Sequence, residues 1–130
     1  ISIGRPSMSK ASELAEFGSG ISSGPNAVEG LAKSWSNFNG TGTIALSDSF
    51  NVASLTDAAT GKYDTNFTNN MGNGTFAIHV NSDANTTNDA FNRTAGGSNN
   101  TTAKGQARHY ESNSLEDTAL VITTVHGDLA

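Results

Sequence analysis

The chain has 130 residues, a formal net charge of −5 at neutral pH and no cysteine, so it suffices for one domain and contains no disulfide. Its 7 Lys and Arg residues form no cluster, which argues against nucleic acid as a partner. No apolar run approaches the roughly 20 residues that span a bilayer, and no basic and apolar leader is visible, so we expect neither membrane insertion nor a signal peptide. The lack of cysteine is consistent with folding in a reducing cytoplasm, and the start at Ile1 suggests a fragment or a processed product.

Small polar residues dominate the composition. Asn, Ser, Thr and Gly make up about 46% of the chain, whereas Leu, Ile, Val and Phe make up about 18%. So low an apolar content is typical of disordered chains when the net charge is high, but the net charge here is small. We therefore expect either that part of the chain is loosely ordered or that neighbouring copies complete the core, as in a homotrimer.

Residues 1–33 differ from the rest and are expected to form a linker or short helices. Ser9–Phe17 contains helix formers, and a second helical segment begins at Pro25, a favoured residue at the first helical position. In this second segment the apolar residues recur with helical spacing, at Val28, Leu31, Ala32 and Trp35. The alternative is an extended linker that descends from a fibre shaft.

From Trp35 onward the apolar residues alternate with polar ones, and Gly, Asn and Asp interrupt the pattern. This period predicts an all-β domain over residues 34–130, an antiparallel β-sandwich. We expect Phe50 and Val52 on one face of a strand, residues 57–61 as a five-residue hairpin loop, and the apolar run at 120–122 in a central strand. The predicted strands are 35–38, 43–47, 50–56, 62–68, 75–81, 88–93, 105–112 and 118–126.

Three segments carry a resemblance to a known family: residues 35–46 (WSNFNGTGTIAL), 49–52 (SFNV) and 61–68 (GKYDTNFT). They are similar to the β-rich C-terminal module of bacteriophage tail fibres, which commonly contains W-x-N-F-N-G-T-G-T-x-A-I, then S-F-N-V, then T-G-x-Y-x-x-N-F-T. The chain departs from that pattern at Met71-Gly72-Asn73, where the family has Met-Pro, and at its end, where His126-Gly127 replaces Phe-Gly. Residues 81–104 have no recognisable counterpart.

The resemblance implies a homotrimeric sandwich at the tip of a viral fibre, folded in the host cytoplasm and carried on the virion with other fibre or tail proteins. Such a tip binds a host-cell surface receptor, either a glycan or an outer-membrane protein, without catalysis and without a cofactor, and gains strength from several copies. Three alternatives stay open: a purely structural fibre or trimerisation module, a glycan-degrading enzyme, and a bacterial adhesin domain.

Receptor contacts are expected in the loops 57–61, 82–87 and 94–104. Stacking on sugar rings would fall to Tyr110, Trp35 or Tyr63, although Trp35 is expected more often as a core residue. The candidate receptor-binding residues are Asp83, Asn85, Thr87, Asn99, Asn100 and Tyr110.

No catalytic or metal-binding pattern stands out. Glu111, Glu116 and Asp117 have no defined separation of the kind that glycoside hydrolysis requires, and the adjacent pair is expected as a solvated turn. Residues 81–85 (NSDAN) alternate oxygen ligands like a calcium loop, but Thr86 and Asn92 stand where Gly and Glu are expected.

The three histidines, His79, His109 and His126, lack metal-ligand spacing and are expected to be exposed or hydrogen-bonded on strands. The resemblance leaves one other role for His109 or His126, a metal ion held on the axis of a trimer.

Overall fold

A computed structural model describes residues 30–83, 92–96 and 99–130, and the fold presented below is the compact unit Ala32–Ala130. Within these residues no helix is long and apolar enough to cross a membrane. The chain forms the strands β1 (Ser34–Asn39), β2 (Ala45–Phe50), β3 (Val52–Ala59), β4 (Lys62–Phe67), β5 (Ala77–Ser82), β6 (Asn92–Gly96), β7 (Lys104–Glu111), β8 (Ser114–Leu115) and β9 (Val121–His126).

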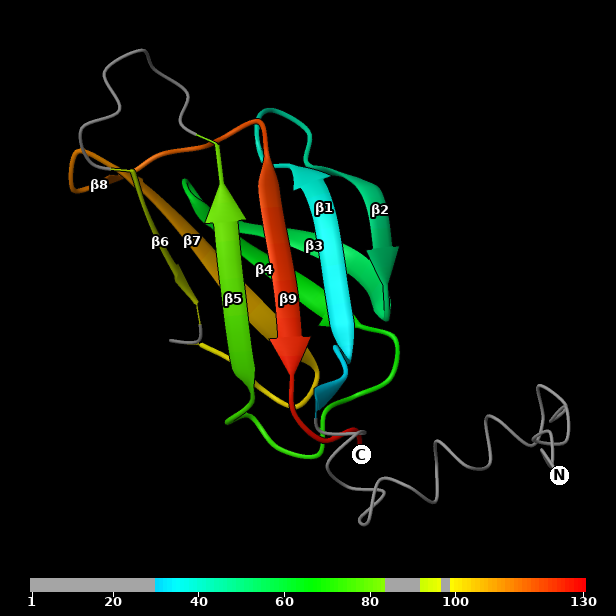
Figure 1. Cartoon of the computed structure of the whole chain (residues 1–130). Coiled ribbons are helices and arrows are strands. Elements are labelled where there is room, and N and C mark those ends of the chain that lie inside the picture. Colours follow the sequence, from blue (N-terminus) through cyan, green and yellow to red (C-terminus); the bar gives the residue numbers. More distant parts are fainter. Residues whose placement is uncertain (1–29, 84–91, 97–98) are drawn as a thin grey trace, which may run out of the picture. The chain divides into compact units, whose positions relative to one another are not determined.

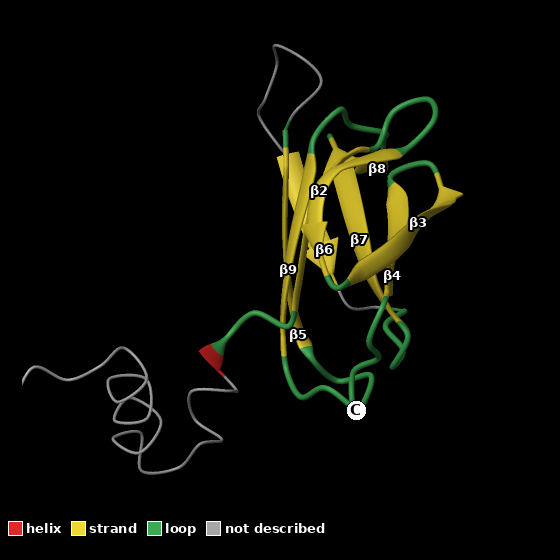
Figure 2. Cartoon of the chain, turned by 90° about the vertical axis from the view of Figure 1, so that its right-hand side faces the viewer, coloured by secondary structure: helices red, strands yellow, loops and turns green. Residues whose placement is uncertain are grey.

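The strands form two antiparallel sheets that face each other (Figures 1 and 2). One sheet has four strands in the order β2-β1-β9-β5, and the other has the order β3-β4-β7-β6 with β8 paired to β7. The all-β prediction is confirmed, and β9, which contains most of the apolar run, lies inside its sheet between β1 and β5 as predicted. The arrangement is that of a β-sandwich, with the core between the sheets.

The core is built by alternation along each strand. Phe38, Val121 and Val125 point inward from the four-stranded sheet, and Tyr63 and Phe67 point inward from the five-stranded sheet. Phe38 and Tyr63 meet edge to face with ring centroids 5.5 Å apart, a favourable geometry for an aromatic pair. Polar side chains complete the interior, for example Ser36 and Thr123, whose hydroxyl oxygens lie 2.6 Å apart.

The turn between β1 and β2 explains the Asn-Gly-Thr-Gly sequence. The Oδ1 atom of Asn39 accepts hydrogen bonds from the backbone N–H of Thr41, at 3.0 Å, and from its hydroxyl, at 2.8 Å. Gly42 then adopts a positive φ of 60°, which glycine tolerates without steric cost. The turn returns the chain as the edge strand β2.

Three sequence predictions are wrong in detail. The predicted helix that begins at Pro25 does not continue to Trp35, because Leu31, Ala32 and Lys33 are not helical and β1 begins at Ser34; the part of the predicted helices before residue 30 lies outside the described residues. The hairpin between β3 and β4 has only Thr60 and Gly61 between its strands. Phe50 and Val52 do not share a face, because the positive φ of the intervening Asn51 marks the crossing from one sheet to the other.

Candidate functional site

The outer surface of the four-stranded sheet carries exposed aromatic and apolar side chains, and we call it the aromatic face. Trp35 and Phe50 are 37% and 54% exposed and lie directly opposite each other on β1 and β2. Ile122 on β9 is 39% exposed. The cross-strand register arranges the face in two rows, Phe50–Trp35–Thr124–His79 and Asp48–Asn37–Ile122–Asn81.

Two shallow pockets adjoin along β5 and β9 at this sheet. One, of about 240 Å³, is lined by His79, Val80, Asn81, Ile122 and Thr124. The other, of about 280 Å³, shares Asn81 and Ile122 and extends to Asp83. Pockets that enclose a small molecule usually measure about 300–1,000 Å³, so these depressions suit a surface contact better than an enclosed ligand.

The outer surface of the five-stranded sheet is polar, and we call it the polar face. It comprises Ser54 and Thr56 of β3, Lys62, Asp64 and Asn66 of β4, and Lys104, Gln106, Arg108 and Tyr110 of β7, which the alternation and the register place on one side.

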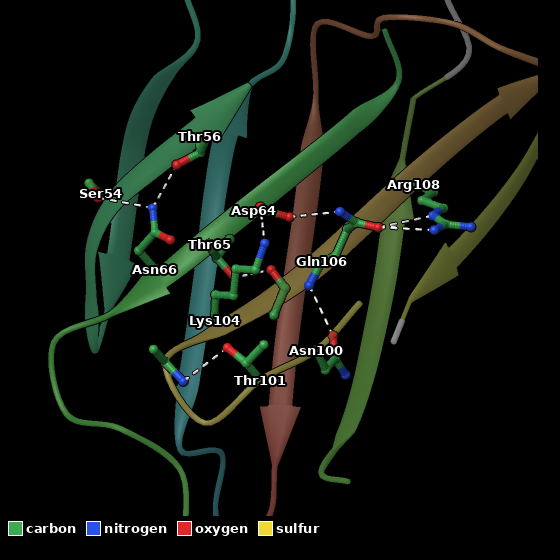
Figure 3. Close-up of polar contacts among 12 residues, drawn as sticks. Ser54, Thr56, Asp64, Thr65, Asn66, Asn100, Thr101, Lys104, Gln106 and Arg108 are labelled. Carbon is green, nitrogen blue, oxygen red and sulfur yellow. Dashed lines mark hydrogen bonds and ion pairs between the residues drawn. The ribbon is translucent and has the colours of Figure 1, made fainter. Parts of the chain in front are cut away.

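A chain of hydrogen bonds runs across the centre of the polar face (Figure 3). The Asp64 carboxylate accepts a bond of 2.8 Å from Nε2 of Gln106 and forms a 2.5 Å ion pair with Nζ of Lys104. Gln106 in turn accepts two bonds of 3.1 Å, from Nε and Nη2 of Arg108, at its Oε1 atom. Asp64 and Gln106 are only 4% and 3% exposed although they lie on an outer face, so the centre of the network is shielded from water.

The loop before β7 supports this network. Oδ1 of Asn100 accepts a 3.0 Å hydrogen bond from the backbone N–H of Gln106, and Thr101 pairs with Lys104 through backbone bonds. Nearby, the side-chain amide of Asn66 donates to the hydroxyls of Ser54 and Thr56, at 3.1 and 2.9 Å.

A second polar chain lies between the sheets. The hydroxyl oxygen of Ser82 lies 2.6 Å from Nδ1 of His109, and Nε2 of His109 lies 3.6 Å from Oε1 of Glu111. Serine, histidine and a carboxylate also form hydrolytic triads, but there the histidine must exchange protons with a substrate. Here His109 is fully buried, so the chain links β5 to β7 instead.

Tyr63 binds the two loops at one end of the sandwich. Its hydroxyl donates to the carbonyl oxygen of Gly40 and to Oδ1 of Asp117, at 3.0 and 3.2 Å, and accepts from the backbone N–H of Thr118 at 3.2 Å. Burial, with a smaller contribution from the charge of Asp117, raises the pKa of Tyr63 to about 12. Asp117 also accepts a 2.7 Å bond from the N–H of Gly61, so it is not the solvated turn residue predicted.

The predicted receptor residues do not gather at one place. Asp83 follows β5 and Tyr110 lies near the end of β7, and the contact between Ser82 and His109 places both at one end of the sandwich. Asn99 is exposed beside Asn100, before the start of β7, at the opposite end of that strand. Asn85 and Thr87 lie outside the described residues.

The exposed and the buried aromatic residues are not those that the sequence predicted. Tyr63 is fully buried and cannot stack on a ligand, whereas Trp35, expected in the core, lies on the aromatic face. The sequence could not show that Trp35 faces outward, because successive residues of a strand point to opposite faces and either face can be the inner one. The burial of Ser34 and Ser36 shows that their side of β1 is inside.

The three carboxylates considered for hydrolysis have separate surroundings. Glu111 lies beside the buried His109, Glu116 is exposed, and Asp117 is bound by Gly61 and Tyr63. In the described part of the chain no three His, Asp or Glu side chains come together as metal ligands would. His79 and His126 are ring neighbours on the aromatic face, with centroids 6.1 Å apart.

Comparisons with protein-family models, with curated proteins and with solved structures found no match to this chain.

Proposed function

We propose that this protein is the receptor-binding tip of a viral fibre, a homotrimeric β-sandwich that attaches a virion to a host-cell surface without catalysis. The observation that carries the proposal is the chemical difference between the two outer faces of the sandwich. One face exposes Trp35, Phe50 and Ile122, and the other presents a hydrogen-bonded network centred on Asp64 and Gln106. The phage-fibre pattern in residues 35–68 points to the same role.

The aromatic face is assigned to contacts between copies of this chain. Exposed apolar patches on small proteins mark interaction surfaces, and aromatic residues are enriched at the centre of such interfaces. The core that the described residues build is small, with eight buried hydrophobic residues, so additional burial between copies would stabilise the fold. Trp35 and Phe50, opposite each other, are the expected centre of the interface.

The polar face is assigned to the receptor. Its amide, hydroxyl and charged groups suit a polar surface such as a glycan, and the network holds them in fixed positions before a ligand arrives. Because weak contacts repeated on three copies reinforce each other, a trimer needs no deep pocket for firm attachment.

The first test is the solution mass of the wild-type chain and of a Trp35→Glu/Phe50→Glu variant, measured by light scattering on a sizing column. We expect three chain masses for the wild type and one for the variant, with circular dichroism showing that the variant stays folded. A control pair, Thr43→Glu/Ala58→Glu, changes exposed residues away from the aromatic face and should remain trimeric. A monomeric wild type would contradict the trimer.

The second test is attachment to intact cells from a panel of bacterial strains, measured by flow cytometry with labelled protein. At least one strain should bind the trimer, and the monomeric variant should bind it at least about a hundredfold more weakly because avidity is lost. Absence of binding to every strain would favour the purely structural module. Release of reducing sugar from the cell walls would instead favour the enzyme alternative.

A further inference from the structure

The positive charges of the described sandwich are concentrated on one face. Of the four Lys and Arg residues whose side chains the structure describes, Lys62, Lys104 and Arg108 lie on the polar face, and only Lys33 does not. Among the residues described on this face, the single acidic one is Asp64, which is paired with Lys104. A chain with a net charge of −5 therefore carries a locally cationic surface.

Arg108 is held with one edge of its guanidinium occupied and the other edge open. Nε and Nη2 donate to the same oxygen of Gln106, and Gln106 is itself anchored by Asp64 and by Asn100. A guanidinium has five N–H groups, so three remain, on Nη1 and Nη2, and they meet no acceptor among the described residues. Figure 3 shows Arg108 at the end of this chain of bonds, directed away from Asp64.

A second cation lies directly beside it. The register of β4 and β7 places Lys62 opposite Arg108, and side chains in such pairs have Cβ atoms about 4.5–5.5 Å apart. Like charges in directly opposite positions destabilise a sheet. In the described structure neither residue has a carboxylate partner, since the ion pairs there are Lys104–Asp64 and His109–Glu111. On the other flank of Arg108, the directly opposite residue of β6 is the small Ala95.

We propose that Lys62 and the free edge of Arg108 form a site for an anionic group, a carboxylate or a phosphate, of a surface polysaccharide. An anion between the two cations would offset their repulsion, and the open edge of the guanidinium matches the two oxygens of a carboxylate or phosphate. Gln106 is the positioning residue, because it fixes which edge of Arg108 faces outward. Tyr110, two residues further along the same face, is placed to contact the sugar that carries the anion.

The proposal rests on the proposed function only in assigning the polar face to the receptor. The test is binding of the full chain to immobilised polygalacturonate, phosphomannan and neutral dextran, measured by biolayer interferometry in low salt. We expect binding to at least one of the two anionic polymers, none to dextran, and weakening as salt rises from about 50 to 300 mM. Preference for polygalacturonate identifies the carboxylate as the source, and preference for phosphomannan identifies the phosphate.

Variants separate a built site from general electrostatics. Arg108→Ala should weaken binding about tenfold or more, and Arg108→Lys should weaken it about fivefold because the charge stays while the two-pronged contact is lost. Lys62→Ala should weaken it about threefold to tenfold. The charge-matched control Lys10→Ala, outside the sandwich unit, should bind like the wild type. Thermal unfolding of each variant checks that its sheet is intact.

The outcomes distinguish this proposal from the proposed function. Failure of the wild type to bind either anionic polymer, full binding by Arg108→Lys, or equal losses in Lys10→Ala and Lys62→Ala would each overturn the anion site. A trimer that attaches to cells equally well with and without Arg108 would leave the fibre role standing and remove the site. If the chain is monomeric and attaches to no cell, but its polymer binding depends on Arg108, the anion site stands and the fibre role is contradicted.

Discussion

The ring of Tyr63 stands directly over Gly40, and its hydroxyl donates a 3.0 Å hydrogen bond to the carbonyl oxygen of that glycine. A Cβ atom added to Gly40 would lie 2.6 Å from Cζ of Tyr63 and 2.8 Å from the carbonyl oxygen of Thr118. Gly40 directly follows β1 of one sheet and Tyr63 lies on β4 of the other, so this contact joins the turn after β1 to the start of β4. It gives a physical reason for a glycine in the Asn-Gly-Thr-Gly turn.

Gly40→Ala should therefore destabilise the fold. The added methyl group collides with a buried ring and with backbone, and overpacking of this kind typically costs about 1–3 kcal/mol. Urea unfolding followed by circular dichroism would measure the loss. Gly72→Ala is the matched control, because its Cβ would meet its nearest neighbour at an ordinary 3.5 Å. Equal stability of the two variants would show that the Tyr63 ring moves aside freely.

Stability should decrease at alkaline pH through Tyr63. Burial raises its pKa to about 12 in the folded chain, above its ordinary value of 10.0, so the folded state retains a proton that the unfolded state releases. The contribution is complete below about pH 10 and is lost as the pH rises towards about 12. Urea unfolding at pH 8 to 12 would record this decline.

Tyr63→Phe is the variant that isolates this effect. It removes the titrating group and leaves the N–H of Thr118 without its acceptor, so it should be less stable by about 1–3 kcal/mol at neutral pH. Its stability should then change less between pH 10 and 12 than that of the wild type, because the hydroxyl whose pKa is raised is absent. Parallel curves for the two proteins would rule out Tyr63 as the source of the alkaline loss.

The buried histidine should contribute to stability. His109→Ala removes a fully buried ring together with its contact to Ser82, and we expect a loss of about 2–4 kcal/mol from the cavity and the unpaired hydroxyl. Thermal unfolding would measure it. Thr43→Ala is the control, since Thr43 is exposed in the turn between β1 and β2, and its midpoint should stay close to that of the wild type. A similar drop in both variants would contradict a specific role for the chain from Ser82 to Glu111.

The ion pair on the polar face should matter more than an ordinary surface pair. Asp64→Ala removes the acceptor of both Lys104 and Gln106, and we expect a loss of about 2 kcal/mol, below the value for fully buried pairs because Lys104 is partly exposed. Chemical unfolding would measure it, with Asp128→Ala, an exposed aspartate, as the charge-matched control. If raising the salt concentration abolished the difference, the pair would be an ordinary screened surface contact.

The sequence determined most of the strands of this protein and their order along the chain, although it did not predict β8. Alternation marks a strand because successive side chains point to opposite faces, so local pattern alone located β1, β4, β5, β7 and β9 within a few residues. The turn residues between them, such as Gly42 and Gly61, are fixed by local backbone geometry, and both have positive φ. These features depend on neighbours in the chain, which the sequence displays directly.

Only the tertiary structure decided which side of each strand is buried and which residues meet. The helical spacing that ended at Trp35 gave no hint that this side chain faces outward on a strand opposite Phe50. The sequence also could not show that Arg108, Gln106 and Asp64 form one chain of hydrogen bonds. Asp64 lies on β4, 42 residues before Gln106 on β7. Contacts between distant segments depend on sheet pairing and register, which set the two faces and therefore the candidate sites.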